Sequence, residues 1–166
     1  EVPEIWMEPA DDQPREVMPT LVQGGRERGL ILHKLMEEII TGETGTAADA
    51  LVERVEALIG EFGRVSVSDP STGLSAKELA GCVIRTLSLP EIAALLPDLR
   101  AEFPVYSASA VNGEEIASVG IADALTLTTD GHPAVVIDWK SDVNPDTNTL
   151  QHYRSQVRAY LDMTGA

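Results

Sequence analysis

The sequence has a single cysteine, Cys82, in 166 residues. One thiol cannot form a disulfide within the chain, nor supply the thiolates of a zinc or iron–sulfur site, so we expect no iron–sulfur cluster. The sequence also lacks the G-x-x-x-x-G-K-[ST] phosphate loop, which argues against a nucleotide site in this chain. No run approaches about 18 consecutive apolar residues, so we expect neither a transmembrane helix nor a membrane partner.

Positive charge is scarce as well. The chain carries 12 Lys and Arg against 27 Asp and Glu, a formal net charge of −15. A domain that grips nucleic acid by bulk electrostatics has the opposite sign. Any nucleic-acid role must therefore depend on a local site, a metal ion or a partner that supplies positive charge.

The first 20 residues hold six acids, one base and four prolines. Such a segment can bury little surface, so we interpret residues 1–20 as an acidic, proline-rich linker or arm. The remainder, residues 21–166, has the length of one folded domain. The chain also begins without a methionine, and we interpret it as a fragment of a longer polypeptide.

Apolar residues spaced three and four apart predict helices in five places, namely residues 26–40, 47–59, 75–87, 91–96 and, after a polar loop, 150–163. Two of these helices are preceded by serines with a glutamate three positions on, Ser75 with Glu78 and Ser88 with Glu91. This is the spacing of a capping box, which predicts where each helix begins.

Between the fourth and fifth helices the pattern changes to that of strands. Residues 102–107 and 116–129 have extended patterns, and the pair Asp130-Gly131 marks a tight turn. Residues 134–139 form a short apolar run, typical of a central strand that is buried on both faces. The order of elements predicts an α/β fold, with a small mixed central sheet flanked by helices and a helical N-terminal half.

Two acids and a base lie around this turn. Asp138 ends the apolar run and Lys140 follows two positions later, so strand alternation places both side chains on one face. Asp123 and Asp138 are nearly equidistant from Asp130, so a hairpin sets the two carboxylates roughly opposite each other. Adjacent carboxylates repel unless a cation lies between them, and oxygen ligands suit Mg²⁺ or Mn²⁺. A simple salt bridge at the strand end is the alternative interpretation of Asp138 and Lys140.

These residues resemble the PD-(D/E)XK nuclease superfamily, with Ala122 in place of the proline. The match is to the RecB branch of this superfamily, which is the nuclease domain of UvrD/Rep-type helicase–nucleases. Four segments match its motifs: residues 29–33 (GLILH, for G-x-x-x-H), 120–123 (GIAD, for G-x-x-D), 137–141 (IDWKS, for D-Y-K-T) and 156–160 (QVRAY, for Q-x-x-x-Y). Glu102 matches the acid that precedes the first core strand. The resemblance implies a restriction-endonuclease-like core.

The resemblance also implies two sets of functional residues. The expected metal ligands, for Mg²⁺ or Mn²⁺, are His33, Asp123, Asp138 and the main-chain carbonyl of Trp139. The expected catalytic residues are Asp123, Asp138, Lys140, Gln156 and Tyr160.

Within these sets, Lys140 would orient or deprotonate the attacking water and offset charge on the phosphate. Gln156 and Tyr160, one helical turn apart, would steady the phosphate or Lys140. Glu102 would be an auxiliary metal group. Each residue also has an ordinary structural interpretation: a surface or hydrogen-bonded core position for His33, a core position for Tyr160, a solvated helix position for Gln156, and a common acid before a strand for Glu102.

The function that follows is a Mg²⁺- or Mn²⁺-dependent deoxyribonuclease domain that hydrolyses phosphodiester bonds of single-stranded DNA during double-strand-break repair and recombination. We expect the isolated domain to bind DNA weakly. Helicase domains of the parent polypeptide, with a partner subunit, would feed it the strand in the bacterial cytoplasm. The alternative is a catalytically silent, nuclease-like scaffold or DNA guide. A standalone nuclease or a cysteine-clustered relative is the third interpretation, which the single cysteine and the linker-like start disfavour.

Overall fold

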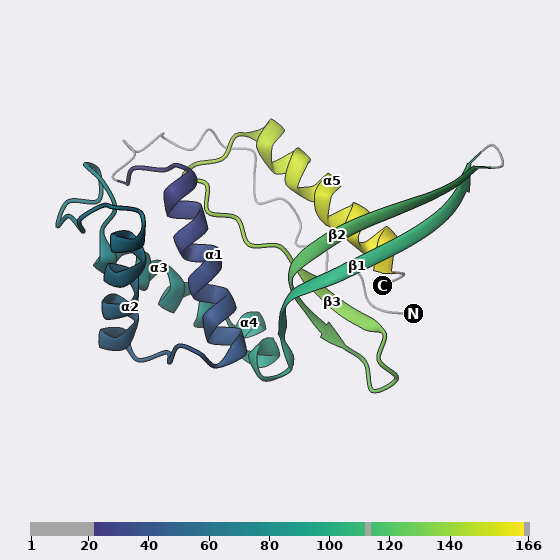
Figure 1. Ribbon diagram of the computed structural model, residues 1–166, viewed down its shortest axis with the longest axis horizontal. Helices are drawn as coiled ribbons and strands as arrows, with labels where there is room; N and C mark the ends of the chain where they lie inside the picture. The colour runs from purple at the N-terminus through teal and green to yellow at the C-terminus, as the bar shows by residue number, and fades with distance from the viewer. Residues whose placement is uncertain (1–21, 112–113, 165–166) are drawn as a thin grey trace.

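The computed structural model describes residues 22–111 and 114–164, and the expected linker, residues 1–20, lies outside these ranges. A helical layer stands beside a long β-hairpin, and the last helix lies along that hairpin (Figure 1). In chain order the elements are α1 (Arg26–Thr41), α2 (Ala48–Glu61), α3 (Ala76–Leu87), α4 (Pro90–Leu95), the 3₁₀ turn η1 (Leu96–Asp98), β1 (Arg100–Val111), β2 (Glu114–Leu127), β3 (Pro133–Ile137) and α5 (Thr147–Thr164). The predicted α/β class, with its helical N-terminal half, is confirmed.

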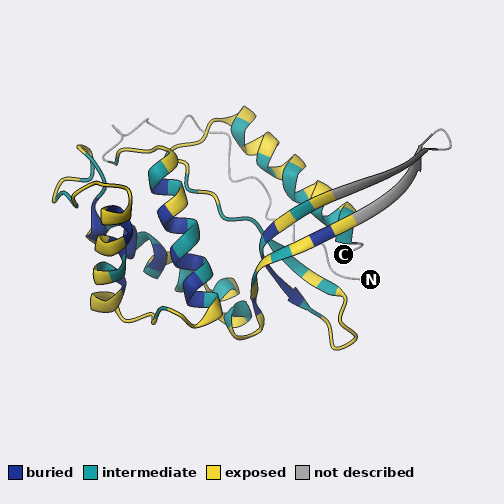
Figure 2. Ribbon diagram, viewed as in Figure 1, coloured by how far each residue is buried: buried dark blue, intermediate teal, exposed yellow. Residues whose placement is uncertain are grey.

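The helical layer is held together by the apolar stripes of α1, α2 and α3, which turn inward to one core (Figure 2). Its largest fully buried side chains are Ile31, Leu35, Leu51, Val55, Ile59, Leu79 and Val83. Each such side chain stabilises the fold by roughly 1.5–3 kcal/mol relative to exposure. This core holds α1 rigidly, so that the other face of α1 can present side chains to the sheet.

Neither predicted capping box forms, although α3 begins directly after Ser75, as predicted. The helix α4 begins at Pro90 after Leu89, because Ser88 ends α3 and its hydroxyl donates to the Ile84 carbonyl at 2.7 Å. Ser75 is the residue before the first turn of α3, but its side chain makes no cap hydrogen bond, and the N–H of Ala76 donates to Ser66 Oγ at 3.0 Å. The Glu78 side chain does not cap α3, because it pairs with Arg28 of α1 at 2.8 Å. A contact between two helices therefore replaces the local contact that the spacing predicted.

The length and hydropathy of the helices bear on the membrane question. Within the described ranges, no single helix is long and apolar enough to cross a membrane. One pair of consecutive helical segments, α3 and residues Pro90–Asp98, is long and apolar enough when taken together. The two segments are bent by 72° relative to each other.

The described strands form one antiparallel sheet in the order β1-β2-β3. The prediction that residues 134–139 form a central strand buried on both faces is wrong, because β2 is central and β3 is a partly buried edge strand. The apolar composition suits either position, and among the described strands none pairs with the outer side of β3. Gly131 adopts a left-handed φ of 82° and its N–H donates to the Thr128 carbonyl at 2.9 Å, which folds β3 back onto β2.

The helix α5 covers one face of the β1–β2 hairpin. Its Tyr160 and Met163 pack against Val105 and Ala122. Gly120 permits this approach, because a Cβ atom at that position would lie 2.9 Å from Tyr160 Cε1. The glycine of the G-x-x-D segment therefore has a packing role beneath the helix.

The start of α5 differs from the prediction by three residues. The helix begins at Thr147 rather than at residue 150. The reason is a local cap, because the Asp146 carboxylate accepts the N–H of Thr149 at 2.7 Å. Composition alone had made this stretch resemble a polar loop.

Replacing Gly120 by alanine will destabilise the fold, because the new methyl group would meet the Tyr160 ring. We expect the free energy of unfolding, measured by urea denaturation, to fall by about 1–3 kcal/mol. Gly45→Ala is the matched control, since nothing lies within 4 Å of a Cβ built there. A Gly120→Ala variant as stable as the parent would contradict the packing of α5 described above.

Candidate active site

The pairing of β2 with β3 brings the two predicted aspartates together. Ala124 of β2 pairs with Ile137 of β3. The same register, continued by one residue, places Asp123 opposite Asp138. Asp138 lies just beyond the end of β3, and Lys140 follows in the loop toward α5. The antiparallel hairpin therefore places both carboxylates at the same end of the sheet, next to α1.

Two groups hold the Asp123 carboxylate in place. The backbone N–H of Trp139 donates to Asp123 Oδ2 at 2.7 Å, and His33 Nδ1 of α1 lies 3.5 Å from the same oxygen. Burial raises the pKa of Asp123, but the contacts with His33 and Trp139 outweigh it, so the pKa is below its usual value. The same carboxylate raises the pKa of His33, despite the opposing effect of burial. Asp123 is thus held ionised near neutral pH.

Asp138 is in a different electrostatic position. Its side chain is only 5% exposed, and its Oδ2 lies 2.7 Å from Lys140 Nζ. That oxygen is buried and has no hydrogen-bond partner among the described residues, although the Lys140 ammonium is paired with it in charge. Burial and the nearby Asp123 raise the pKa of Asp138, and Lys140 only partly offsets them. A second positive charge would relieve this arrangement.

Lys140 is positioned from the other side by α5. Its ammonium donates to Gln156 Oε1 at 2.9 Å and lies 4.8 Å from the centre of the Tyr153 ring. The side chain is 29% exposed, so it reaches solvent while remaining fixed by three groups. Sequence reasoning missed Tyr153, whose place beneath the ammonium follows from its position one turn before Gln156 on α5.

Tyr160 lies one turn further along α5 but does not reach the carboxylates. Its hydroxyl donates to the Ile121 carbonyl at 3.0 Å, and its ring packs over Gly120. The structure therefore places Gln156 at Lys140 and Tyr160 against the backbone of β2. Tyr160 fixes the position of α5, and through it the position of Gln156.

Glu102 sits beside Asp123 on the neighbouring strand. On β1, Ala101 pairs with Ala124 of β2 and Phe103 pairs with Ala122. Glu102 therefore lies opposite Asp123, although these two residues are not themselves paired in the sheet. Its backbone adopts a left-handed φ of 49°, unusual for a side chain larger than glycine. Loss of solvation and the charge of Asp123 raise its pKa. Strained backbone of this kind recurs at functional sites and costs about 1–3 kcal/mol.

The start of α1 is docked against the loop that follows Lys140. Arg28 Nη1 donates to the Ser141 carbonyl at 2.9 Å, and Arg28 is only 6% exposed. A Cβ atom on Gly29 would lie 2.8 Å from Ser141 Oγ, so a larger residue would require the serine side chain to move. In the G-x-x-x-H segment, the glycine therefore lies close to Ser141, and His33 follows one helical turn later. The part played by Arg28 is not visible in the sequence.

Trp139 connects the site to the helical core. Its ring packs against the core of α1, α2 and α3, and its Nε1 is buried without a hydrogen-bond partner in the described part of the chain. Its backbone N–H, rather than its carbonyl, makes the recorded contact with Asp123. A cavity of about 90 Å³ adjoins this region, with His33, Trp139 and Lys140 in its wall.

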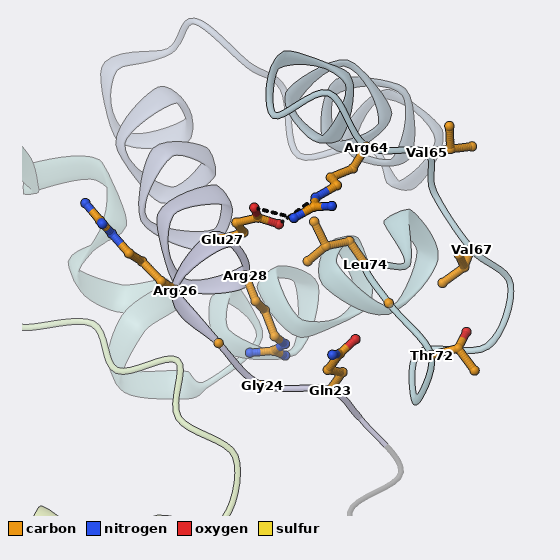
Figure 3. Close-up of a pocket in the computed structure, with 12 residues that line it drawn as sticks. Gln23, Gly24, Arg26, Glu27, Arg28, Arg64, Val65, Val67, Thr72 and Leu74 are labelled. Carbon is orange, nitrogen blue, oxygen red and sulfur yellow. Dashed lines mark hydrogen bonds and ion pairs between the residues drawn. The ribbon is translucent and has the colours of Figure 1, made fainter.

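A larger cavity, of about 530 Å³, lies away from the carboxylates (Figure 3). It is formed by the start of α1 and by the segment that joins α2 to α3. The ion pair of Glu27 with Arg64, at 3.1 Å, lies in its wall. No residue of the expected catalytic or metal-binding sets lines it. Cavity size therefore does not identify the site, whereas the grouping of charged side chains does.

The donor set can be compared with what a divalent metal requires. Mg²⁺ usually takes one or two carboxylates, and water and substrate oxygens complete its coordination. Asp123 and Asp138 supply two carboxylates, and the buried Asp138 Oδ2 lacks a hydrogen bond, so these residues fit such an ion. Within the described ranges, no cluster of three or more His, Cys, Asp or Glu side chains is arranged to hold a metal. The fit is therefore to an ion that keeps several non-protein ligands.

Residues 11–166 match the PD-(D/E)XK nuclease superfamily, and the chain belongs to that family. The fold is consistent with a restriction-endonuclease-like core, and members of the family are generally nucleases that use Mg²⁺ or a similar divalent metal. Comparison with curated proteins gave no match.

Removing either carboxylate will weaken the binding of Mn²⁺ or Mg²⁺. Asp123→Asn and Asp138→Asn each keep the side-chain shape but remove one anionic ligand, and we expect affinity to fall at least about tenfold, a change of roughly 1.4 kcal/mol. Isothermal titration calorimetry measures this directly. Asp130→Asn, in the exposed turn of the same hairpin, is the control. Unchanged affinity in both site variants would contradict the metal assignment.

Proposed function

We propose that this chain is a metal-dependent deoxyribonuclease domain of the RecB type, acting on single-stranded DNA. The observation that carries the proposal is the convergence of Asp123, Asp138 and Lys140 at one end of the sheet, with Gln156 holding the lysine. The four RecB-like segments support the branch, because each contributes a contact to this one site or to the helix packing around it. A silent scaffold would not require this charged arrangement, which costs desolvation energy to bury.

The proposed ligands of the ion are the carboxylates of Asp123 and Asp138, with the Trp139 carbonyl and His33. A bound Mg²⁺ or Mn²⁺ would lower the pKa of a water molecule and offset phosphate charge. Lys140 would hold the attacking water or the phosphate, because its ammonium is fixed by Asp138 and Gln156 and still reaches solvent. Glu102 would act as an auxiliary group opposite Asp123.

The charge of the chain supports a tethered role. With a net charge of −15, the domain gains little from the counterion release that usually drives DNA binding. We infer that helicase domains of the same polypeptide, with a partner subunit, deliver the strand during double-strand-break repair. The bacterial cytoplasm is the proposed location of that work.

Lys140→Ala and Asp138→Ala will each lower the rate of single-stranded DNA cleavage by about 100-fold or more, because the first removes the ammonium that offsets phosphate charge and the second removes a proposed ligand of the ion. The assay follows an end-labelled oligonucleotide with Mg²⁺ or Mn²⁺ present. Lys77→Ala, on the exposed face of α3, is the matched control and should cleave at the parental rate. Cleavage that survives both site changes would overturn the assignment, and a folded parent protein that never cleaves would favour the scaffold interpretation.

A further inference from the structure

One face of the β1–β2 hairpin is apolar and exposed. Tyr106 and Val119 are register partners that are 65% and 67% exposed, and the adjoining pair is Pro104 with Ile121, which is 54% exposed. All four side chains lie on the same side of the hairpin, because strand residues alternate between faces. We call these four residues the hairpin face. The helix α5 covers the opposite side, where Val105 is 4% exposed and Ala122 is fully buried.

The hairpin face continues directly into the carboxylate site. Asp123 lies two positions beyond Ile121 on β2, and Glu102 lies two positions before Pro104 on β1, so both acids occupy the same side. At about 3.3 Å per residue, Val119 is roughly 13 Å from Asp123 along the strand. That length corresponds to about two to four nucleotides of a strand leaving the site.

The chemistry of this surface favours nucleobases over phosphates. None of its four residues is charged, and the nearest acids, Glu102 and Asp123, would repel phosphates that are not neutralised by a metal. Proteins that hold single strands combine positive grooves with aromatic platforms, and this chain has little positive charge to offer. Tyr106 is also the most exposed of the described Phe, Tyr and Trp residues, ahead of Phe62 at 39%.

We propose that the hairpin face is a base-stacking platform for single-stranded nucleic acid, with Tyr106 as its principal contact. This inference rests on the proposed nuclease function and adds to it the residues that hold the strand beside the site. Because stacking requires unpaired base faces, the platform discriminates single strands from duplexes. A protein partner on the same surface is the competing interpretation, and the experiment below separates the two.

The test measures binding of a fluorescein-labelled oligothymidylate by anisotropy at low ionic strength, with Ca²⁺ replacing Mg²⁺ to prevent hydrolysis. We expect Tyr106→Ala to raise the Kd about tenfold, as for the loss of one stacked base. Tyr106→Phe, which keeps the ring, should bind as the parent does. Phe62→Ala is the matched control, since it removes an exposed aromatic at the end of α2, across the helical layer from the hairpin (Figure 1).

Two further readouts separate stacking from a general loss of structure or charge. The slope of log Kd against log salt should be the same for Tyr106→Ala and the parent, because no phosphate contact is lost. Binding of the matched duplex should not change, because its base faces are occupied. Equal losses for duplex and single strand would overturn the proposal.

Unchanged single-strand binding by Tyr106→Ala would also overturn it, and would favour a protein partner for the hairpin face. Cleavage measured in the same preparations distinguishes this failure from failure of the proposed function. Lys140-dependent cleavage together with parental binding by Tyr106→Ala would reject the platform alone. A parent that neither binds nor cleaves single-stranded DNA would reject both.

Discussion

The antiparallel register between β2 and β3 is the constraint on which the site depends. Because side chains alternate along a strand, a slip of one residue would send Asp138 to the opposite face and separate it from Asp123. The register is set by the short turn with Gly131, by a one-residue shift between Leu127 and Thr126, and by the regular pairing from Thr126 to Ala124. Packing of Val136 against the cluster of Val105, Ala122 and Leu125 adds to its stability, since a slip would turn this side chain to the other face.

Two helices, α1 and α5, then position the side chains around the two carboxylates. The start of α1 is fixed by the contacts of Arg28 and Gly29 with Ser141, which places His33 against Asp123. The helix α5 is fixed by Tyr160 over Gly120, which places Gln156 at Lys140. Residues that at first appear catalytic therefore divide into those that meet at the carboxylates and those that position the helices. Such support allows two like charges to be held together, against their mutual repulsion.

The sequence predicted the helices and the hairpin well, because apolar spacing and the Asp130-Gly131 turn are local features. It also predicted that Asp123 and Asp138 would face each other, since the two residues are nearly the same number of positions from the Asp130-Gly131 turn. It could not place β3 at an edge, because an apolar strand has the same composition at an edge or a centre.

The remaining differences concern contacts between distant parts of the chain. Glu78 left its predicted cap because Arg28, fifty positions away, offers a stronger partner. The left-handed backbone of Glu102 likewise has no signature in the sequence, since glutamate rarely adopts it. These features depend on how the helical layer meets the sheet, which local patterns do not specify.

The central claim is that the two aspartates share one divalent cation beside Lys140. Anomalous scattering from crystals of the protein soaked in Mn²⁺ tests it most directly, because the peak locates the ion without reference to activity. The account predicts a peak between the carboxylates of Asp123 and Asp138, within coordination distance of both. A peak bound elsewhere, or bound by neither carboxylate, would contradict it.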